Sequence, residues 1–534
     1  MNRLSLTVAA AAVGLVLSYS IADTRSEAAT PADTLVIADA IDDIVSLDPA
    51  QIFEFSGTDL ANNVYDTLVE LDPNNLGPLV PGIAESWSVA DDGVTYTFKI
   101  RQDLKFHSGN PITAEDAEFS LRRVILLEQT PSFILTQFGF TKDNLEETIK
   151  AVDSHTLQIK TDKAYAPSFV FNCLTAPVAS IVDKKVAMSH EKDGDLGHEW
   201  MKTNSAGSGA FKLKSWKPNE SYVLEANPDY WRGAPAMKRV FVRHVAESAP
   251  QRLLLEKGDI DIARKLSSDD IQALAGKPGV KIEDALKGRV RYFALNQKDP
   301  ILSKPQVREA LKWLVDYEGI TESFLKGRFI VHQAFLPLTY LGELKEKPYK
   351  LDVAKAKQLL AEAGHADGFE VKISVRNHPD RLEVAQSLQN TFGQAGIKVE
   401  LVTGTGKQIL TTYRARQHQI YLGDWGPDYP DPHTNADTFA HNPDNSDEGN
   451  HTGKLAWRNA WDIPEMTNLT SEAVQERDAE VRAEMYRDIQ RQHQKESPFA
   501  VMFQENVQNG MRDNVAGFNS GGPVHDVFYW TVTK

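Results

Sequence analysis

The chain has 534 residues, more than a single compact core usually holds, so two or more lobes are expected. Its composition, 41% hydrophobic and 25% charged, is that of an ordinary soluble globular protein. The formal net charge of -16 argues against a nucleic-acid-binding protein, which would carry a basic face.

The N-terminus has the three parts of a secretory signal peptide. Arg3 precedes an apolar stretch from Leu4 to Leu17, and small residues then offer cleavage after Ala22 or after Ala28. The apolar run is shorter than the roughly 20 residues that span a bilayer, although an uncleaved anchor is the alternative. We therefore predict a signal peptide over residues 1–28 and export to the periplasm.

Cys173 is the only cysteine in the chain. It rules out an intramolecular disulfide, and its apolar neighbours predict a buried, inert thiol. No cysteine follows the apolar run directly, so no lipid anchor is expected.

The first half of the mature chain shows mostly strand patterns and one clear helix. Residues 94–100 alternate with period two after the turn formers at 91–93, which predicts a hairpin strand. Thr113 and Asp116 resemble a capping box and predict a helix that ends near Leu127. Further strands are expected at 34–38 and at two places within 209–226.

After residue 300, helices and strands alternate. Pro305 and Asp352 mark two helix starts, and further helices are expected over about 380–395 and 471–495. Strands are expected at 290–296, 370–375, 397–402, 419–423, 499–503 and 528–532. Such βαβ-like units predict an α/β fold in two lobes. The polar and aromatic segment 430–465 is expected to be an ordered functional loop.

No convincing catalytic or metal-binding arrangement is found. Residues 404–407 lack the spacing of a phosphate loop, and Ser208 lacks the flanking glycines of a nucleophile elbow. His190 and His198 do not form the paired-histidine motif of zinc proteases. We therefore predict no catalytic residue, no metal site and no cofactor, with an exported hydrolase or a hidden histidine site as the disfavoured alternatives.

The segment 422–432 combines turn formers, aromatic side chains and carboxylates directly after a predicted strand. Loops at strand ends are where α/β lobes place ligand contacts. A partly desolvated carboxylate there would bind an ammonium group, and Trp425 and Tyr429 could stack on the ligand. A tight turn with solvated carboxylates is the alternative.

Arg376 is a second candidate, at the end of the strand predicted over 370–375 and just before a helix. Its guanidinium suits bidentate binding of a carboxylate. A surface arginine near a helix start is the alternative.

Several stretches, spread over nearly the whole mature chain, together resemble one family. The chain is similar to the extracytoplasmic solute-binding proteins of family 5, the dipeptide-, oligopeptide- and nickel-binding proteins of ABC importers. The matching stretches are Leu79–Trp87, Asp91–Arg101, Leu104–Asp116, Gly207–Leu213, Asn227–Trp231, Lys304–Leu311 and Trp425–Pro432.

The resemblance implies a two-lobed periplasmic-binding-protein (flytrap) α/β fold with an extra subdomain in the first lobe. The implied division is lobe I at 29–285, lobe II at 286–498, and a return to lobe I at 499–534. Peptide-binding members bind the ligand ammonium with an Asp in the motif matched by Trp425, Gly426 and Asp428. Dipeptide binders bind the ligand carboxylate with an Arg matched by Arg376, and have a Tyr where this chain has His378.

The function implied is that of a monomeric periplasmic protein that closes on a small ligand, preferably a di- or oligopeptide. The closed protein would dock to the ABC permease subunits in the inner membrane, with no bond made or broken. Opines, oligosaccharides, haem and nickel complexes are alternative ligands, since Trp457 and Trp461 could stack on a sugar. A ligand-presenting receptor or chaperone is another class that the fold allows.

Overall fold

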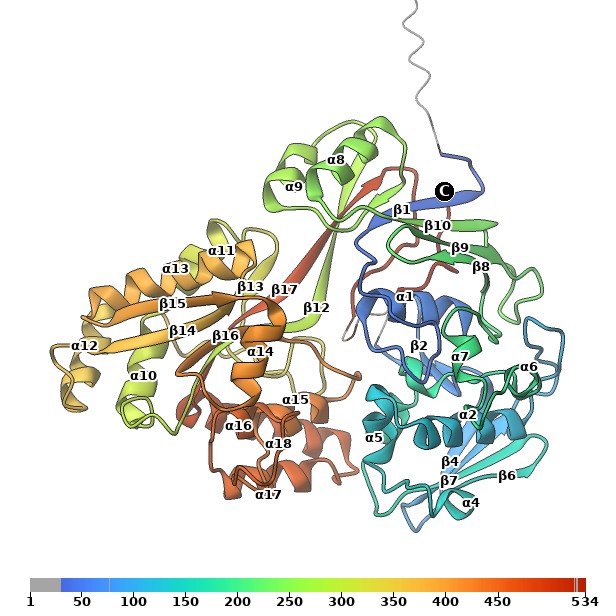
Figure 1. Ribbon diagram of the computed structural model, residues 1–534, viewed down its shortest axis with the longest axis horizontal. Helices are drawn as coiled ribbons and strands as arrows, with labels where there is room; N and C mark the ends of the chain where they lie inside the picture. The colour runs from blue at the N-terminus through green and yellow to red at the C-terminus, as the bar shows by residue number, and fades with distance from the viewer. Residues whose placement is uncertain (1–29, 76, 523, 525–526) are drawn as a thin grey trace, which may run out of the picture.

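The computed structural model describes residues 30–75, 77–522, 524 and 527–534. The predicted signal peptide at 1–28 lies outside the described residues. Two long antiparallel strands, β12 (Val280–Leu295) and β17 (Phe499–Arg512), pair along most of their length and cross the middle of the molecule (Figure 1).

All other strands of the large sheet are added on the two sides of this pair. The sheet has eleven strands, in the order β15-β14-β16-β12-β17-β11-β1-β10-β9-β8, with β13 paired to β17. The strands of the second half of the chain are β13 (Phe329–Val331), β14 (Glu370–Arg376), β15 (Lys398–Gly404) and β16 (Ile420–Trp425). Those of the first half are β1 (Thr34–Asp39), β8 (Phe211–Lys217), β9 (Ser221–Ala226), β10 (Arg239–His244) and β11 (Ile262–Ala263).

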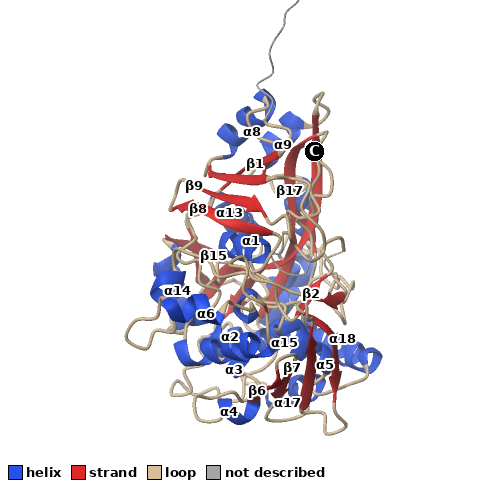
Figure 2. Ribbon diagram, turned by 90° about the vertical axis from the view of Figure 1, so that its right-hand side faces the viewer, coloured by secondary structure: helices blue, strands red, loops and turns tan. Residues whose placement is uncertain are grey.

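A separate four-stranded sheet belongs to the first half of the chain. Its order is β4-β5-β7-β6, and it lies at the opposite end of this half from β1, β8 and β9 (Figure 2). The strands are β4 (Ala84–Val89), β5 (Thr95–Ile100), β6 (Ile149–Asp153) and β7 (Thr156–Lys160), while β2 (Val69–Leu71) pairs with β3 (Leu79–Pro81). This sheet has its own hydrophobic core, distinct from that of the large sheet, with helix α2 (Ala114–Leu127) packed on it.

The remaining helices follow the two halves. The first half holds α1 (Phe55–Val64), α3 (Phe133–Thr136), α4 (Leu145–Thr148), α5 (Pro167–Cys173), α6 (Lys184–Ser189), α7 (His198–Met201), α8 (Ser248–Lys257) and α9 (Ser268–Leu274). The second half holds α10 (Pro305–Trp313), α11 (Tyr317–Glu322), α12 (Val353–Glu362), α13 (Pro379–Gln394), α14 (Gly406–Arg414), α15 (Pro432–Phe439), α16 (Leu455–Arg458), α17 (Pro464–Ala473) and α18 (Ala479–Glu496). Across the described ranges, no helix is long and apolar enough to cross a membrane.

Most predicted elements are confirmed, and the α/β class with them. The Thr113 and Asp116 capping box begins α2, and the Asp352 side chain accepts a hydrogen bond from the backbone of Lys355 at the start of α12. Cys173 is buried as expected, and burial raises the pKa of its thiol.

Three predictions about secondary structure are wrong. The helix predicted over 471–495 is two helices, because α17 ends at Ala473 and Asp478 caps a new helix by accepting hydrogen bonds from the backbone N–H groups of Glu480 and Val481. Residues 528–532 are not a strand: the Tyr529 N–H donates to the Asn63 side chain instead of to a neighbouring strand. The segment 430–465 is not one loop, since α15 and α16 lie within it.

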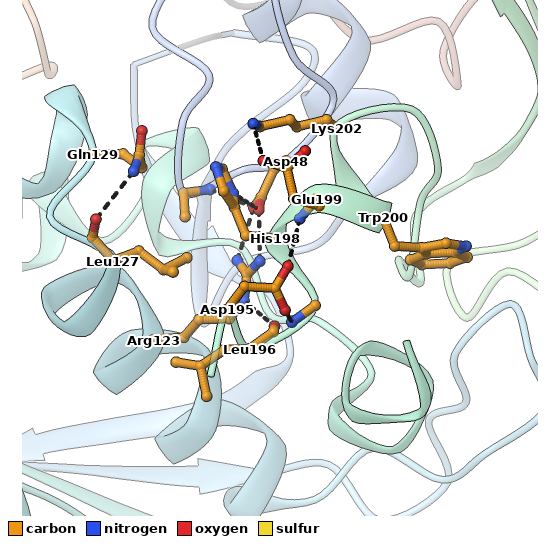
Figure 3. A network of polar contacts seen from close by, with 12 residues as sticks. Asp48, Arg123, Leu127, Gln129, Asp195, Leu196, His198, Glu199, Trp200 and Lys202 are labelled. Carbon is orange, nitrogen blue, oxygen red and sulfur yellow. Dashed lines mark hydrogen bonds and ion pairs between the residues drawn. The ribbon is translucent and has the colours of Figure 1, made fainter. Parts of the chain in front are cut away.

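A buried ion-pair network fixes the segment after β1 to the helices of the first half (Figure 3). Asp48 is fully buried and accepts two hydrogen bonds from Arg123 of α2, at 2.8 and 2.5 Å, and one from His198 Nδ1 at 2.6 Å. Arg123 also donates to the Leu196 carbonyl at 2.9 Å. Burial opposes ionisation of Asp48, but the bonds from Arg123 and His198 hold its pKa below its usual value.

Asp48→Asn leaves the buried Arg123 guanidinium without its counter-charge, and we expect it to lower the free energy of unfolding by about 3–5 kcal/mol. Urea unfolding at neutral pH measures this difference. Glu199→Gln is the control, because the Glu199 carboxylate is exposed and its one ion-pair partner among the described residues is Lys202. Its loss should change the free energy by less than about 1 kcal/mol. Equal effects of the two variants would contradict the importance of the network.

Candidate ligand-binding cavity

A cavity of about 750 Å³ is lined by residues from both halves of the chain. Its volume falls within the range of roughly 300–1,000 Å³ that is usual for small-molecule sites. The first half contributes residues of the 52–58, 131–137 and 175–178 segments. The second half contributes the end of β16, the loop after it and residues of the 450–458 segment.

The wall from the first half is largely apolar. Phe53, Phe55 and Phe133 line the cavity, and each is 40% exposed, which is unusual for so large an apolar side chain. The Phe53 and Phe133 rings meet edge to face with centroids 5.9 Å apart. Exposed aromatic surface of this kind favours an apolar part of a ligand on this side of the cavity.

The wall from the second half carries the charges. Asp424, near the end of β16, is held by Arg291 of β12 at 2.7 Å and by Arg381 of α13 at 2.7 Å. Burial opposes its ionisation, but the two guanidinium groups lower the pKa of Asp424 far below its usual range. This carboxylate is therefore neutralised within the protein.

Asp437, on α15, is likewise neutralised. It pairs with Lys454 at 2.5 Å and with His441 Nδ1 at 2.8 Å. These partners outweigh burial and lower the pKa of Asp437.

Asp428 differs from both of these acids. Its backbone N–H donates to the Thr434 hydroxyl at 3.1 Å, but its carboxylate has no ion-pair or hydrogen-bond partner among the described residues. Burial and the nearby negative charge of Asp437 raise the pKa of Asp428 to about 7. A carboxylate in this state would gain strongly from a cation in the cavity.

Arg376 completes β14, and its guanidinium also lines the cavity. Its Nε is buried without a hydrogen-bond partner within the described parts of the chain. The Trp425 Nε1 is in the same state, so the cavity presents two buried donors that need an acceptor.

The structure brings five of the six predicted site residues together. Arg376, Trp425, Gly426, Asp428 and Tyr429 all line the cavity. His378 does not: it is exposed at the N-terminal cap of α13, and its backbone N–H donates to the Arg376 carbonyl.

Tyr429 is too deeply buried for its ring to stack on a ligand as predicted. Its ring packs against Phe169 of the first half, with centroids 5.8 Å apart, and its hydroxyl donates to the Gln137 side chain at 3.4 Å. Tyr429 therefore connects the two halves at the edge of the cavity.

A second contact between the halves surrounds the buried pair of Asp431 and Arg482. The pair is bidentate, at 2.7 and 2.9 Å, and Arg482 also donates to the Ser168 hydroxyl of α5 at 3.0 Å. The backbone N–H of Ala166 donates to the carbonyl of Val474 at 2.9 Å. These contacts place the two halves against each other beside the cavity.

The family "bacterial extracellular solute-binding proteins, family 5 (middle)" matches residues 78–447 of the chain. The chain belongs to this family. The family 5 resemblance and the two-lobed binding-protein fold expected from the sequence are thereby confirmed.

Individual relatives agree with this family 5 assignment. The chain is 29% identical over 507 residues to the probable D,D-dipeptide-binding periplasmic protein of Escherichia coli, covering 94% of each. A solved dipeptide-binding protein from Pseudoalteromonas, in complex with Met-Leu, superposes with a TM-score of 0.78 at 22% identity, over 94% of this chain and 100% of that one. A protein in complex with mannopinic acid from Agrobacterium superposes with a TM-score of 0.76 at 22% identity, over 94% and 99%.

The expectation that Trp457 and Trp461 could stack on a sugar does not fit the cavity. Trp457 and Trp461 are buried, 3% and 7% exposed, and neither lines the cavity where a sugar could stack on it. Within the described ranges, no group of three or more His, Cys, Asp or Glu residues could hold a metal ion.

Two cavity residues, Arg414 and Arg458, were not predicted from the sequence. Each is the last residue of a helix, α14 and α16 respectively, and the two helices lie on either side of segment 422–432 in the chain. An arginine in the last turn of a helix is common for electrostatic reasons alone, so the sequence offered no distinguishing signal.

Because Asp428 has no described partner and Asp424 has two, replacing each by Asn should change the stability of the ligand-free protein in opposite directions. Because the pKa of Asp428 is raised in the folded protein, its ionisation opposes folding as the pH rises from about 4 through about 7. Asp428→Asn should therefore stabilise the protein at about pH 8, by about 1 kcal/mol or more, and give no gain at about pH 4.

Asp424→Asn is the matched control, since it leaves two guanidinium groups without their carboxylate. We expect it to destabilise the protein by about 3–5 kcal/mol at pH 8. Thermal and urea unfolding of ligand-stripped protein at both pH values measures the two effects. A destabilising Asp428→Asn would show that Asp428 has a partner within the protein.

Proposed function

We propose that this family 5 protein is a periplasmic binding protein that captures a short peptide and delivers it to an ABC importer. The observation that carries the proposal is that one cavity holds two opposite charges without partners among the described residues. These are the carboxylate of Asp428 and the guanidinium of Arg376. A zwitterionic peptide offers an ammonium group to the first and a carboxylate to the second. The probable D,D-dipeptide-binding relative and the dipeptide-binding protein in complex with Met-Leu support this ligand class.

Gly426 and Trp425 would form the wall between the two charged ends of the ligand. Gly426 brings the backbone close to the ligand, and the free Trp425 Nε1 would donate to a peptide carbonyl. The exposed Phe53, Phe55 and Phe133 would contact apolar side chains of the peptide. His378, outside the cavity, would act only through the position of Arg376.

Closure of two lobes on the ligand is the proposed mechanism. We propose lobe I at 29–285, lobe II at 286–498, and a return of the chain to lobe I at 499–534. The register of the β12–β17 pair shifts between Leu286 and Val290, which is a suitable place for the lobes to rotate. A ligand that contacts both lobes favours the closed arrangement by its differential affinity for it.

The remaining parts of the proposal concern the protein in the cell. Residues 1–28 would be removed on export, leaving a periplasmic protein without a lipid anchor. Family 5 binding proteins deliver their ligands to ABC permeases, and we propose that the closed monomer docks to such a permease without catalysing a reaction.

A peptide with a free ammonium group should bind with at least about 30-fold higher affinity than its N-acetylated form, since acetylation leaves Asp428 unpaired. The Asp428→Asn variant should bind the free peptide about as weakly as the wild type binds the acetylated peptide. Acetylation should then lower the affinity of this variant only slightly. Isothermal titration of refolded, ligand-stripped protein with a dipeptide panel gives the coupling energy of this cycle.

Arg376→Gln serves as the control variant, because it should weaken the free and the acetylated peptide by the same factor. An acetylation penalty that persists unchanged in Asp428→Asn would contradict the role of Asp428. Tight binding of an opine or sugar, with no response to any peptide, would overturn the peptide assignment.

A further inference from the structure

Three arginines line the same cavity from three separate elements of the second half. Arg376 ends β14, Arg414 ends α14 and Arg458 ends α16. A peptide needs one of them for its terminal carboxylate, so two guanidinium groups remain without an assigned role.

None of the three has a carboxylate partner among the residues that the structure describes. The buried Nε of Arg376 has no hydrogen-bond partner at all. Arg458 is buried, donates its Nε to the Thr452 carbonyl at 2.6 Å, and lies over the Tyr413 ring at 5.2 Å. Arg414 makes neither an ion pair nor a hydrogen bond with a described residue.

Arg414 lies close enough to Arg458 and Arg376 for their positive charges to oppose its own. Desolvation, and then the positive charges of Arg458 and Arg376, lower the pKa of Arg414. Other arginines around the site are compensated: Arg291 and Arg381 share Asp424, and Arg482 is paired with Asp431. Like charges gathered without a counter-ion cost stability, so the cluster points to an anionic ligand.

Among the described residues that line the cavity, the positive and negative charges do not balance. Of the three described lining carboxylates, Asp424 and Asp437 are neutralised by their own partners, and Asp428 has no described partner. Three unpaired guanidinium groups therefore face one unpaired carboxylate. A simple zwitterion with one ammonium and one carboxylate would leave this excess of positive charge in place.

We propose that Arg376, Arg414 and Arg458 bind two anionic groups at one end of the ligand, so the preferred ligand is a short peptide whose C-terminal residue carries an acidic side chain. The proposal rests on the proposed peptide-binding function and narrows its ligand class. The terminal carboxylate and the acidic side chain share the arginine cluster, while the ammonium group lies at Asp428. A carboxylate or a phosphoryl group on that C-terminal residue has the required chemistry.

The test compares isosteric ligands by isothermal titration of the full mature protein at physiological salt. The ligands are Ala-Glu against Ala-Gln for a carboxylate, and Ala-phosphoserine against Ala-Ser for a phosphoryl group. We expect the acidic member of at least one pair to bind about tenfold or more tightly than its neutral partner. The pair that shows the preference identifies the anionic group.

Arg414→Gln is the diagnostic variant, because Arg414 is exposed at the helix end and its replacement leaves the buried core intact. We expect it to lower the affinity for the acidic peptide at least about fivefold more than the affinity for its neutral partner, which reduces the acidic preference. Lys407→Gln is the matched control: it removes the same charge from the first turn of the same helix, where the exposed Lys407 does not line the cavity. The control should keep the full preference.

Two failures can be told apart. If neutral dipeptides bind well and neither acidic ligand is preferred, or if Arg414→Gln and Lys407→Gln behave alike, the acidic-ligand proposal is overturned and peptide binding stands. If no dipeptide binds at all, the proposed function fails and this inference fails with it.

Discussion

The pairing of β12 with β17 is the constraint on which the rest of the structure depends. These strands, 16 and 14 residues long, carry the strands of the first half at one end and those of the second half at the other (Figure 1). Because both halves are attached to one ribbon, their facing surfaces enclose the cavity while each keeps its own core. The register shift between Leu286 and Val290 interrupts the ladder where the attachment changes from one half to the other.

The distribution of charges follows from that arrangement. Acids and bases that hold the fold are paired and buried, as in the network of Asp48 with Arg123 and the pair of Asp431 with Arg482. Asp428 and the three arginines of the cavity have no ion-pair partner among the described residues, at a cost in stability that a ligand of opposite charge would remove. Leaving these groups without partners follows the usual trade between stability and binding.

Local signals in the sequence were enough for much of the fold, because they act over a few residues. The cap at Asp352, the capping box at Thr113 and the alternation over 94–100 all predicted elements that form. The irregular end at 528–532 could not be predicted, since it depends on Asn63, far away in the chain. The break between α17 and α18 comes from a local cap at Asp478, which lies inside the segment predicted as one helix. Arg376 and the segment that contains Asp428 were predicted from their places at strand ends, and the family resemblance then implied their roles. Arg414 and Arg458 meet them only through tertiary packing.

The proposed ligand lies between the two halves with its ammonium at Asp428 and its anionic end at the arginines. A crystal structure of the mature protein with its tightest-binding peptide tests this most directly. We predict an ammonium nitrogen within about 3 Å of the Asp428 carboxylate and carboxylate oxygens within hydrogen-bond distance of Arg376. A peptide bound in the reverse direction, or outside the cavity, would contradict the account.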